Sequence, residues 1–96
     1  MIKILMVCGA GLGSSFAMEM AVESVVKEIG LDASLDHTDI SSASGVQADI
    51  VIAANNFEDQ VKRYGMNSHL IFLNNLIDKK EIKEKLVPVL EENNYI

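Results

Sequence analysis

Short apolar runs alternate with longer amphipathic stretches along the 96-residue chain. The most nearly continuous runs, residues 2–7 (IKILMV) and 49–54 (DIVIAA), are typical of strands buried on both faces of a parallel sheet. Residues 69–73 (HLIFL) predict a further strand, and the weak alternation over 33–37 (ASLDH) indicates an edge strand. The hydrophobic pattern therefore predicts four strands.

Between these runs the apolar spacing changes to the period of a helix. The segment from Ser15 to Ile29 predicts an amphipathic helix, and Gly30 predicts its C-terminal cap. Asn55 and Asn56 are predicted to cap a short helix from about Phe57 to Tyr64. The inward side of the first helix is predicted to carry Phe16, Met20, Val22, Val25, Val26 and Ile29, and the outward side Glu19, Glu23 and Lys27.

A last helix is predicted to begin at Asp78, because Glu81 three residues later gives a start like a capping box. We expect Pro88 to kink this helix. Its inward residues are predicted to be Ile82, Leu86, Val89 and Leu90.

Strands that alternate with helices predict βαβ units with right-handed crossovers. We expect one domain over residues 1–96, of the three-layer α/β class, with a four-stranded parallel sheet in the order 2-1-3-4 and helices on both faces, as in Rossmann-like and flavodoxin-like folds. In such a sheet the crevice opens between the C-terminal ends of the first and third strands. That rule places residues 8–15 beside residues 54–57.

Charge and cysteine content narrow the classes of function. The 14 acidic and 8 basic residues give a net charge of −6, with no basic stripe, which argues against a nucleic-acid surface. No apolar run approaches the roughly 18 residues that span a bilayer, so we expect no membrane insertion. Cys8 is the single cysteine of the sequence, so an internal disulfide is excluded. The chain also lacks the ligand spacing of a zinc site, and this cysteine content is typical of a cytoplasmic protein. We expect neither a metal nor a cofactor.

The segment CGAGLGSS, residues 8–15, follows the first predicted strand and carries the candidate chemistry. It is not a Walker loop, because no lysine follows the last glycine, and its G-x-G-x-G spacing differs from the dinucleotide fingerprint. It is like the tyrosine-phosphatase loop, but Ser14 stands where that loop has its arginine, while Ser15 fits.

The loop nevertheless predicts a place for a phosphoryl group. Gly9, Gly11 and Gly13 permit positive φ, so that successive backbone N–H groups form an anion nest over Cys8. The next helix adds N-terminal donors, and no Glu or Gln stands three residues after either serine to occupy them. The same field favours the thiolate form of Cys8 and so predicts a nucleophile.

Three alternatives stay open on the residues alone. A free cysteine is often an inert buried residue. A small cysteine-dependent phosphatase or arsenate reductase would use the same strand-loop-helix, although Ser14 replaces the arginine and a second cysteine is absent. A regulatory anion-binding module would keep Cys8 unmodified.

The segments KILMV, CGAGLGSS and SSFAMEM together make the chain resemble the IIB component of the bacterial phosphoenolpyruvate-dependent sugar phosphotransferase system. The similarity is to the ascorbate type, related to the galactitol and lactose types. It implies that Cys8 accepts a phosphoryl group from a phosphohistidine of the IIA protein and passes it to a sugar bound in the membrane IIC protein, which is a protein-phosphohistidine–sugar phosphotransferase activity. Carried over position by position, the phosphate-binding loop is Gly9, Ala10, Gly11, Leu12, Gly13, Ser14 and Ser15.

The apolar residues at positions 10 and 12 leave the sugar open, so that an ascorbate-like compound or a polyol fits the resemblance. If Leu12, Phe16 or Met18 is exposed, an apolar docking surface for IIA and IIC is expected around Cys8.

The remaining polar residues are assigned lesser roles. Asn55 and Asn56 have pocket lining at the sheet edge as a second possible role after capping. His37 is expected to be partly exposed among acidic neighbours, and His69 to lie at the sheet edge opposite the crevice. Met6, Met18 and Met20 are predicted to fill the core, and Lys62 and Arg63 to face solvent.

Overall fold

Strands and helices alternate along the chain in the computed structural model, which describes residues 2–8, 12–39, 47–63, 68–75 and 77–95. For residues 8, 12–16, 39 and 56 it describes the backbone. Gly9 to Gly11 of the predicted phosphate-binding loop and Tyr64, the predicted end of the short helix, lie outside the described residues. The elements are β1 (Ile2–Cys8), α1 (Leu12–Glu28), β2 (Ala33–Asp39), β3 (Ile50–Ala54), the 3-10 helix η2 (Asn55–Phe57), α2 (Glu58–Arg63), β4 (His69–Leu73) and α3 (Lys79–Glu92).

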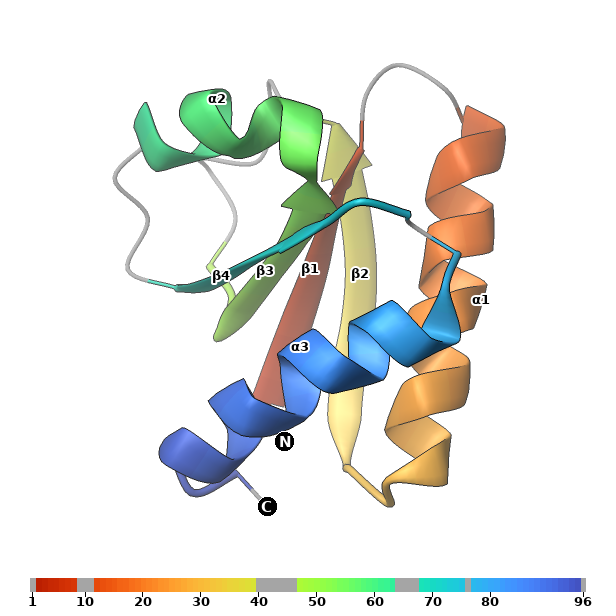
Figure 1. Ribbon diagram of the computed structural model, residues 1–96, viewed down its shortest axis with the longest axis vertical. Coiled ribbons are helices and arrows are strands. Elements are labelled where there is room, and N and C mark those ends of the chain that lie inside the picture. Colours follow the sequence, from red (N-terminus) through yellow and green to blue (C-terminus); the bar gives the residue numbers. More distant parts are fainter. Residues whose placement is uncertain (1, 9–11, 40–46, 64–67, 76, 96) are drawn as a thin grey trace.

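The four strands form one parallel sheet in the order β2-β1-β3-β4, which confirms the predicted fold class and topology (Figure 1). β2 is an edge strand, as predicted, but it continues through Thr38 to Asp39. β3 begins at Ile50, one residue later than predicted, because Asp49 uses its backbone N–H to bond the Lys3 carbonyl and its carboxylate to accept the Lys3 N–H.

Alternate residues of β1 enter two separate cores, one on each face of the sheet. Ile4 and Met6 pack under α1 and α3, whereas Leu5 and Val7 pack under α2, which contributes Val61. All five side chains are fully buried. This explains why β1 reads as a continuous apolar run, and it gives the predicted three layers.

α1 begins at Leu12, so the prediction of a start at Ser15 is wrong by three residues. Gly13, which we expected in the loop, lies in the first helical turn, where a glycine is tolerated because this turn lacks half of its backbone bonds. The C-terminal end agrees with the prediction: Gly30 has φ of 72°, its N–H bonds the Lys27 carbonyl, and the Leu31 N–H bonds the Val26 carbonyl. These two bonds form a Schellman motif.

The buried face of α1 differs from the predicted one at two positions. Met20 is 56% exposed, so its assignment to the core is wrong, whereas Ala21, which was not predicted to face inward, is buried. The helix is anchored by Met18, Ala21, Val22, Val25 and Val26, a stripe with spacings of three and four residues. Met6 and Met18 do fill the core, as predicted.

The segment after β3 forms η2 and then α2, rather than one helix from Phe57. Asn55 was predicted to cap this helix, but it is the first residue of η2, and the residue at the cap position is Ala54, which makes no side-chain cap bond. α2 ends at Arg63, and the next described residue is Ser68, directly before β4.

α3 begins at the predicted cap, Asp78, whose carboxylate accepts the N–H groups of Lys80 and Glu81. The reciprocal half of a capping box is absent, because the Glu81 carboxylate accepts N–H groups of the preceding segment instead. The helix continues through Pro88 to Glu92. Ile82, Leu86 and Leu90 are buried and Val89 packs beside them, as predicted.

Candidate functional site

Cys8 is the last residue of β1, a central strand with β2 on one side and β3 on the other. In the sheet, β2 lies on one side of β1, whereas β3 and β4 lie on the other side. The chain therefore changes its direction of winding at β1, and Cys8 lies at the C-terminal end of this strand. Ligands of open parallel sheets bind at this point. The structure therefore places the cysteine backbone where sequence reasoning expected the crevice.

The first turn of α1 begins four positions after Cys8. It contains Leu12, Gly13, Ser14 and Ser15 and carries no acidic residue. The first N–H groups of an α-helix have no carbonyl partner within the helix, and the helix dipole makes this end favourable for an anion. Of the predicted phosphate-binding loop, residues 12–15 thus belong to a helix N-terminus, while Gly9, Ala10 and Gly11 lie outside the described residues.

Asp39 lies beside Cys8 in the register of β1 and β2, and sequence reasoning missed it. The predicted strand ended at His37, two residues before Asp39, which was left without a predicted element. Thr38, a β-branched residue, was the available signal that the strand continues. Extending β2 by two residues would have matched its last residue with the last residue of β1.

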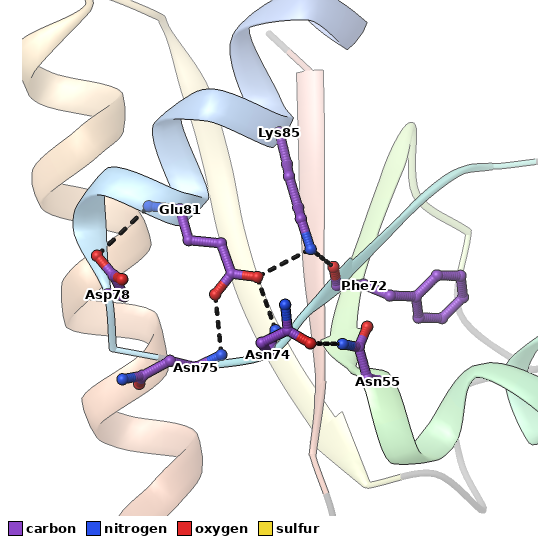
Figure 2. Close-up of polar contacts among 7 residues, drawn as sticks. All are labelled: Asn55, Phe72, Asn74, Asn75, Asp78, Glu81 and Lys85. Carbon is purple, nitrogen blue, oxygen red and sulfur yellow. Dashed lines mark hydrogen bonds and ion pairs between the residues drawn. The ribbon is translucent and has the colours of Figure 1, made fainter.

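At the same edge of the sheet, side chains join the ends of β3 and β4 (Figure 2). Asn55 Nδ2 donates a hydrogen bond to Asn74 Oδ1, so these two residues, which follow adjacent strands, face one another. This contact gives Asn55 a role in place of the predicted cap. Asn56 lies next to it in η2.

The Glu81 carboxylate holds the segment that follows β4. It accepts the Asn74 N–H at 2.7 Å and the Asn75 N–H at 2.9 Å, and it pairs with Lys85 Nζ at 2.8 Å (Figure 2). Lys85 also donates to the Phe72 carbonyl at 2.6 Å. The hydrogen bond from Lys85, followed by those from the two backbone N–H groups, lowers the pKa of Glu81 to about 2, against the opposing effect of desolvation.

The two histidines lie at different places relative to the end of β1: His37 is the register partner of Met6, two residues before Cys8, and His69 begins β4. His37 is 44% exposed in its side chain, and its Nδ1 lies 2.8 Å from Glu19 Oε2, which confirms the expected acidic neighbourhood. His69 begins β4 at the opposite edge of the sheet, as predicted, and packs edge-on against Tyr95 with ring centroids 6.5 Å apart.

Two further searches cover the described part of the chain. In residues 2–8, 12–39, 47–63, 68–75 and 77–95, no group of three or more His, Cys, Asp or Glu side chains is placed to hold a metal ion. Within those same ranges, every helix is too short or too polar to cross a bilayer.

Comparison with known proteins settles the family. The family model described as "PTS system, Lactose/Cellobiose specific IIB subunit" matches residues 3–87, from β1 into α3. The chain belongs to this IIB family of the sugar phosphotransferase system. The resemblance seen in the sequence is thereby confirmed, and the matched range includes both Cys8 and the segment held by Glu81.

Two relatives of the IIB family are described as ascorbate-specific PTS system EIIB components. The one from Mycoplasma pneumoniae is 29% identical over 91 residues, which cover 93% of this chain and 95% of the relative. The one from Salmonella choleraesuis is 31% identical over 98 aligned positions, which cover 96% of this chain and 92% of the relative. These similarities extend over nearly the whole chain.

A solved structure has the same fold. The lactose-specific IIB component domain of the phosphoenolpyruvate:carbohydrate phosphotransferase system from Streptococcus pneumoniae superposes with a TM-score of 0.59 at 19% identity. The superposition covers 94% of this chain and 95% of that one. The four-stranded parallel sheet with helices on both faces is thus the architecture of a known IIB domain.

Proposed function

We propose that this chain, as a single IIB domain over residues 1–96, carries a phosphoryl group on Cys8 from a phosphorylated IIA protein to a sugar bound in a membrane IIC protein. The observation that supports this most strongly is the position of Cys8, at the C-terminal end of a central parallel strand and four residues before a long helix begins. Membership of the IIB family supports the same role.

In the first step, the Cys8 thiolate attacks the phosphorus atom of a phosphohistidine on IIA. The S–P bond forms as the P–N bond breaks, and the imidazole leaves with the electron pair of that bond. No general base is needed, because the nucleophile is already an anion. Phosphoryl transfer of this kind depends mainly on positioning and on stabilisation of charge.

In the second step, a hydroxyl oxygen of the sugar attacks the phosphorus atom of phosphocysteine. The O–P bond forms, the S–P bond breaks, and Cys8 leaves as the thiolate while the hydroxyl proton passes to a base or to water. The protein therefore returns to its starting state without hydrolysing the group. The IIC protein is proposed to hold the sugar, an ascorbate-like compound or a polyol.

The charge of phosphocysteine is proposed to be met by backbone N–H groups rather than by an arginine. The first-turn amides of α1, at residues 12–15, have no acidic competitor in their own turn. Together with Gly9, Ala10 and Gly11 they form the proposed phosphate-binding loop. Hydrogen bonds from such amides and the helix dipole stabilise an anion at this place. The proposed location is the cytoplasm, where a thiol stays reduced.

Transfer from a labelled donor tests the proposal. The wild-type protein and a Cys8→Ser variant are incubated with a phosphorylated IIA protein of an ascorbate-specific phosphotransferase system, and the label on each is measured. We expect one phosphoryl group per wild-type chain and none on the variant. An unlabelled wild type would contradict the proposal, and so would turnover of p-nitrophenyl phosphate at the rate of a phosphatase. Unfolding of Cys8→Ser is checked separately, so that loss of label is not attributed to loss of fold.

A further inference from the structure

We infer that the corner between β4 and α3, formed by Ile77, Lys79 and Lys80, is the surface on which the phosphorylated donor protein docks. The inference rests on the function proposed above and concerns its first step. We call these three residues the β4–α3 corner. The partner that this surface fits is a protein that carries negative charge around its phosphohistidine.

The β4–α3 corner lies at the edge of the sheet where Cys8 lies. Val7 of β1 is the register partner of Ala53 of β3, and Ala53 is the register partner of Phe72 of β4. The next residue of each strand is its last one, so β1, β3 and β4 end side by side. With about 4.8 Å between neighbouring strands, the end of β4 is roughly 10 Å from the end of β1. Both views show the start of α3 beside α1, the helix that follows β1 (Figures 1 and 2).

Lys79 and Lys80 stand at helix positions that disfavour cations. They are the first two residues of α3, where the helix dipole presents its positive end and where acidic residues are stabilising. Each lysine there is unfavourable to the stability of the helix. Binding of a negatively charged partner would account for two lysines at this unfavourable place.

These two lysines are also free for such a partner. In the part of the chain that the structure describes, the other lysines are each paired with a carboxylate, whereas Lys79 and Lys80 are exposed and make no ion pair. The paired ones are Lys3, Lys27, Lys62, Lys83 and Lys85.

Overall charge makes a local positive surface necessary. The chain has a net charge of −6, and a phosphohistidine adds two negative charges to the donor. A negatively charged phosphoryl group approaches this acidic chain faster where a local positive charge faces it. The exposed lysine pair beside the phosphoryl-transfer edge supplies that local attraction.

Ile77 gives the β4–α3 corner an apolar centre. Its side chain is 59% exposed, and in the described part of the chain the other large exposed hydrophobic residue is Met20 of α1. Hydrogen bonds to side chains hold described residues at Ile77 and near it: Asn75 Oδ1 accepts the Ile77 N–H at 3.1 Å, Glu81 accepts the Asn74 N–H, and Asp78 accepts the Lys80 N–H. A surface fixed in advance loses little conformational entropy when a partner binds.

The rate at which Cys8 is labelled at increasing donor concentrations tests the docking surface; here kcat is the limiting rate constant of labelling and KM is the donor concentration that gives half of it. The variant Lys79→Glu/Lys80→Glu is compared with wild type using a phosphorylated IIA protein of an ascorbate-specific phosphotransferase system. We expect kcat/KM to fall about 10-fold or more at low salt, through KM, with the same final labelling of Cys8 at saturating donor. We expect kcat/KM of the wild type to fall as salt is added, and kcat/KM of the variant to depend less on salt.

A charge-matched control is Lys27→Glu/Arg63→Glu, which makes the same change in net charge at exposed positions of α1 and α2. We expect its kcat/KM to stay within about 2-fold of wild type. Equal losses in both double variants, or no loss in Lys79→Glu/Lys80→Glu, would overturn the docking surface. If wild-type Cys8 is labelled in the same experiment, such a result overturns the docking surface alone. If the wild type is not labelled, both the docking surface and the proposed function are overturned.

Folding does not obscure this test. Glutamate at the first two positions of α3 is favourable to the helix dipole, so the melting temperature of the variant should equal or exceed that of wild type. A second variant, Ile77→Ser, removes the apolar centre without changing charge. We expect its KM to rise about 3-fold or more with an unchanged salt dependence, and an unchanged KM would overturn the role of Ile77.

Discussion

Cys8 and Asp39 are register partners at the C-terminal ends of the neighbouring parallel strands β1 and β2. Their backbones are therefore about 4.8 Å apart across the sheet. We expect the charge of Asp39 to disfavour both a thiolate and a phosphocysteine on Cys8, and the first turn of α1 to favour them. A phosphoryl carrier benefits from this opposition, because a group that is held too firmly is not passed on.

The influence of Asp39 on the thiol is testable by alkylation. In Asp39→Asn we expect iodoacetamide to modify Cys8 about 4-fold faster at pH 7, because one unfavourable charge about 5 Å away is worth roughly 0.8 kcal/mol in water. The matched control is Asp36→Asn, three residues earlier on β2 and paired with Lys3 at 4.0 Å. It should leave the rate nearly unchanged. A slower reaction in Asp39→Asn would contradict the opposing role of this carboxylate.

Glu81 makes stability depend on acid pH. Its pKa is lowered from 4.5 to about 2 in the folded protein, so the charged form contributes stability that is complete above pH 4.5 and is lost as the pH falls toward 2. Because its side chain is 14% exposed, we expect Glu81→Gln to lower the free energy of unfolding by about 1–2 kcal/mol at pH 7.

Urea unfolding at pH 7 and at pH 3 measures this effect. The difference between wild type and Glu81→Gln should be smaller at pH 3 than at pH 7. Glu84→Gln, on the exposed side of the same helix, is the control and should change stability by less than about 0.5 kcal/mol. A deficit in Glu81→Gln that is equal at the two pH values would show that the carboxylate charge is not responsible.

Gly30 ends α1 in a conformation that other residues avoid. A Cβ atom added there meets nothing within 4 Å, so the cost of Gly30→Ala arises from φ of 72° alone and should be about 1 kcal/mol. Gly30→Asn should cost less, since asparagine tolerates this region better. Thermal unfolding of the three proteins gives the order, and an alanine variant as stable as wild type would contradict it.

Met18 and Met20 separate the buried face of α1 from its exposed face. Met18 is fully buried and Met20 is 56% exposed. We expect Met18→Ala to lower the free energy of unfolding by about 2–5 kcal/mol and Met20→Ala by less than about 0.5 kcal/mol. Chemical denaturation measures both values. The reverse order would restore the helical face that the sequence pattern indicated.

Much of the fold could be predicted because the apolar runs are short and differ in period. The strands at 2–7 and 69–73 are confirmed, and so are the sheet order and the cap at Gly30. The face of α1 was harder to predict, because apolar residues surround its N-terminal half and periodicity alone does not distinguish Met18 from Met20. Only packing against the sheet decides which of the two is buried.

The candidate site divides in the same way. Cys8 follows from a local motif, so the sequence was sufficient to find it, and its place at the end of β1 agrees. Two contacts at this end of the sheet could not be predicted because they join segments far apart in the chain: the register of Asp39 with Cys8 and the bond between Asn55 and Asn74. The Glu81 bonds could not be predicted because two local bonding patterns were possible for its carboxylate. The Glu81 carboxylate could accept either the N–H at the cap of α3 or the Asn74 N–H, and no sequence pattern indicates which of these bonds forms. Such contacts depend on strand register, which becomes known only with the tertiary structure.

The central claim is that the phosphoryl group resides on the sulfur atom of Cys8, and mapping the modified residue tests it most directly. The protein is incubated with its phosphorylated IIA donor, digested at neutral pH, and its peptides are sequenced by tandem mass spectrometry. We predict a single phosphoryl group, on Cys8. A phosphoryl group found instead on His37, His69 or either serine of the α1 first turn would contradict the account.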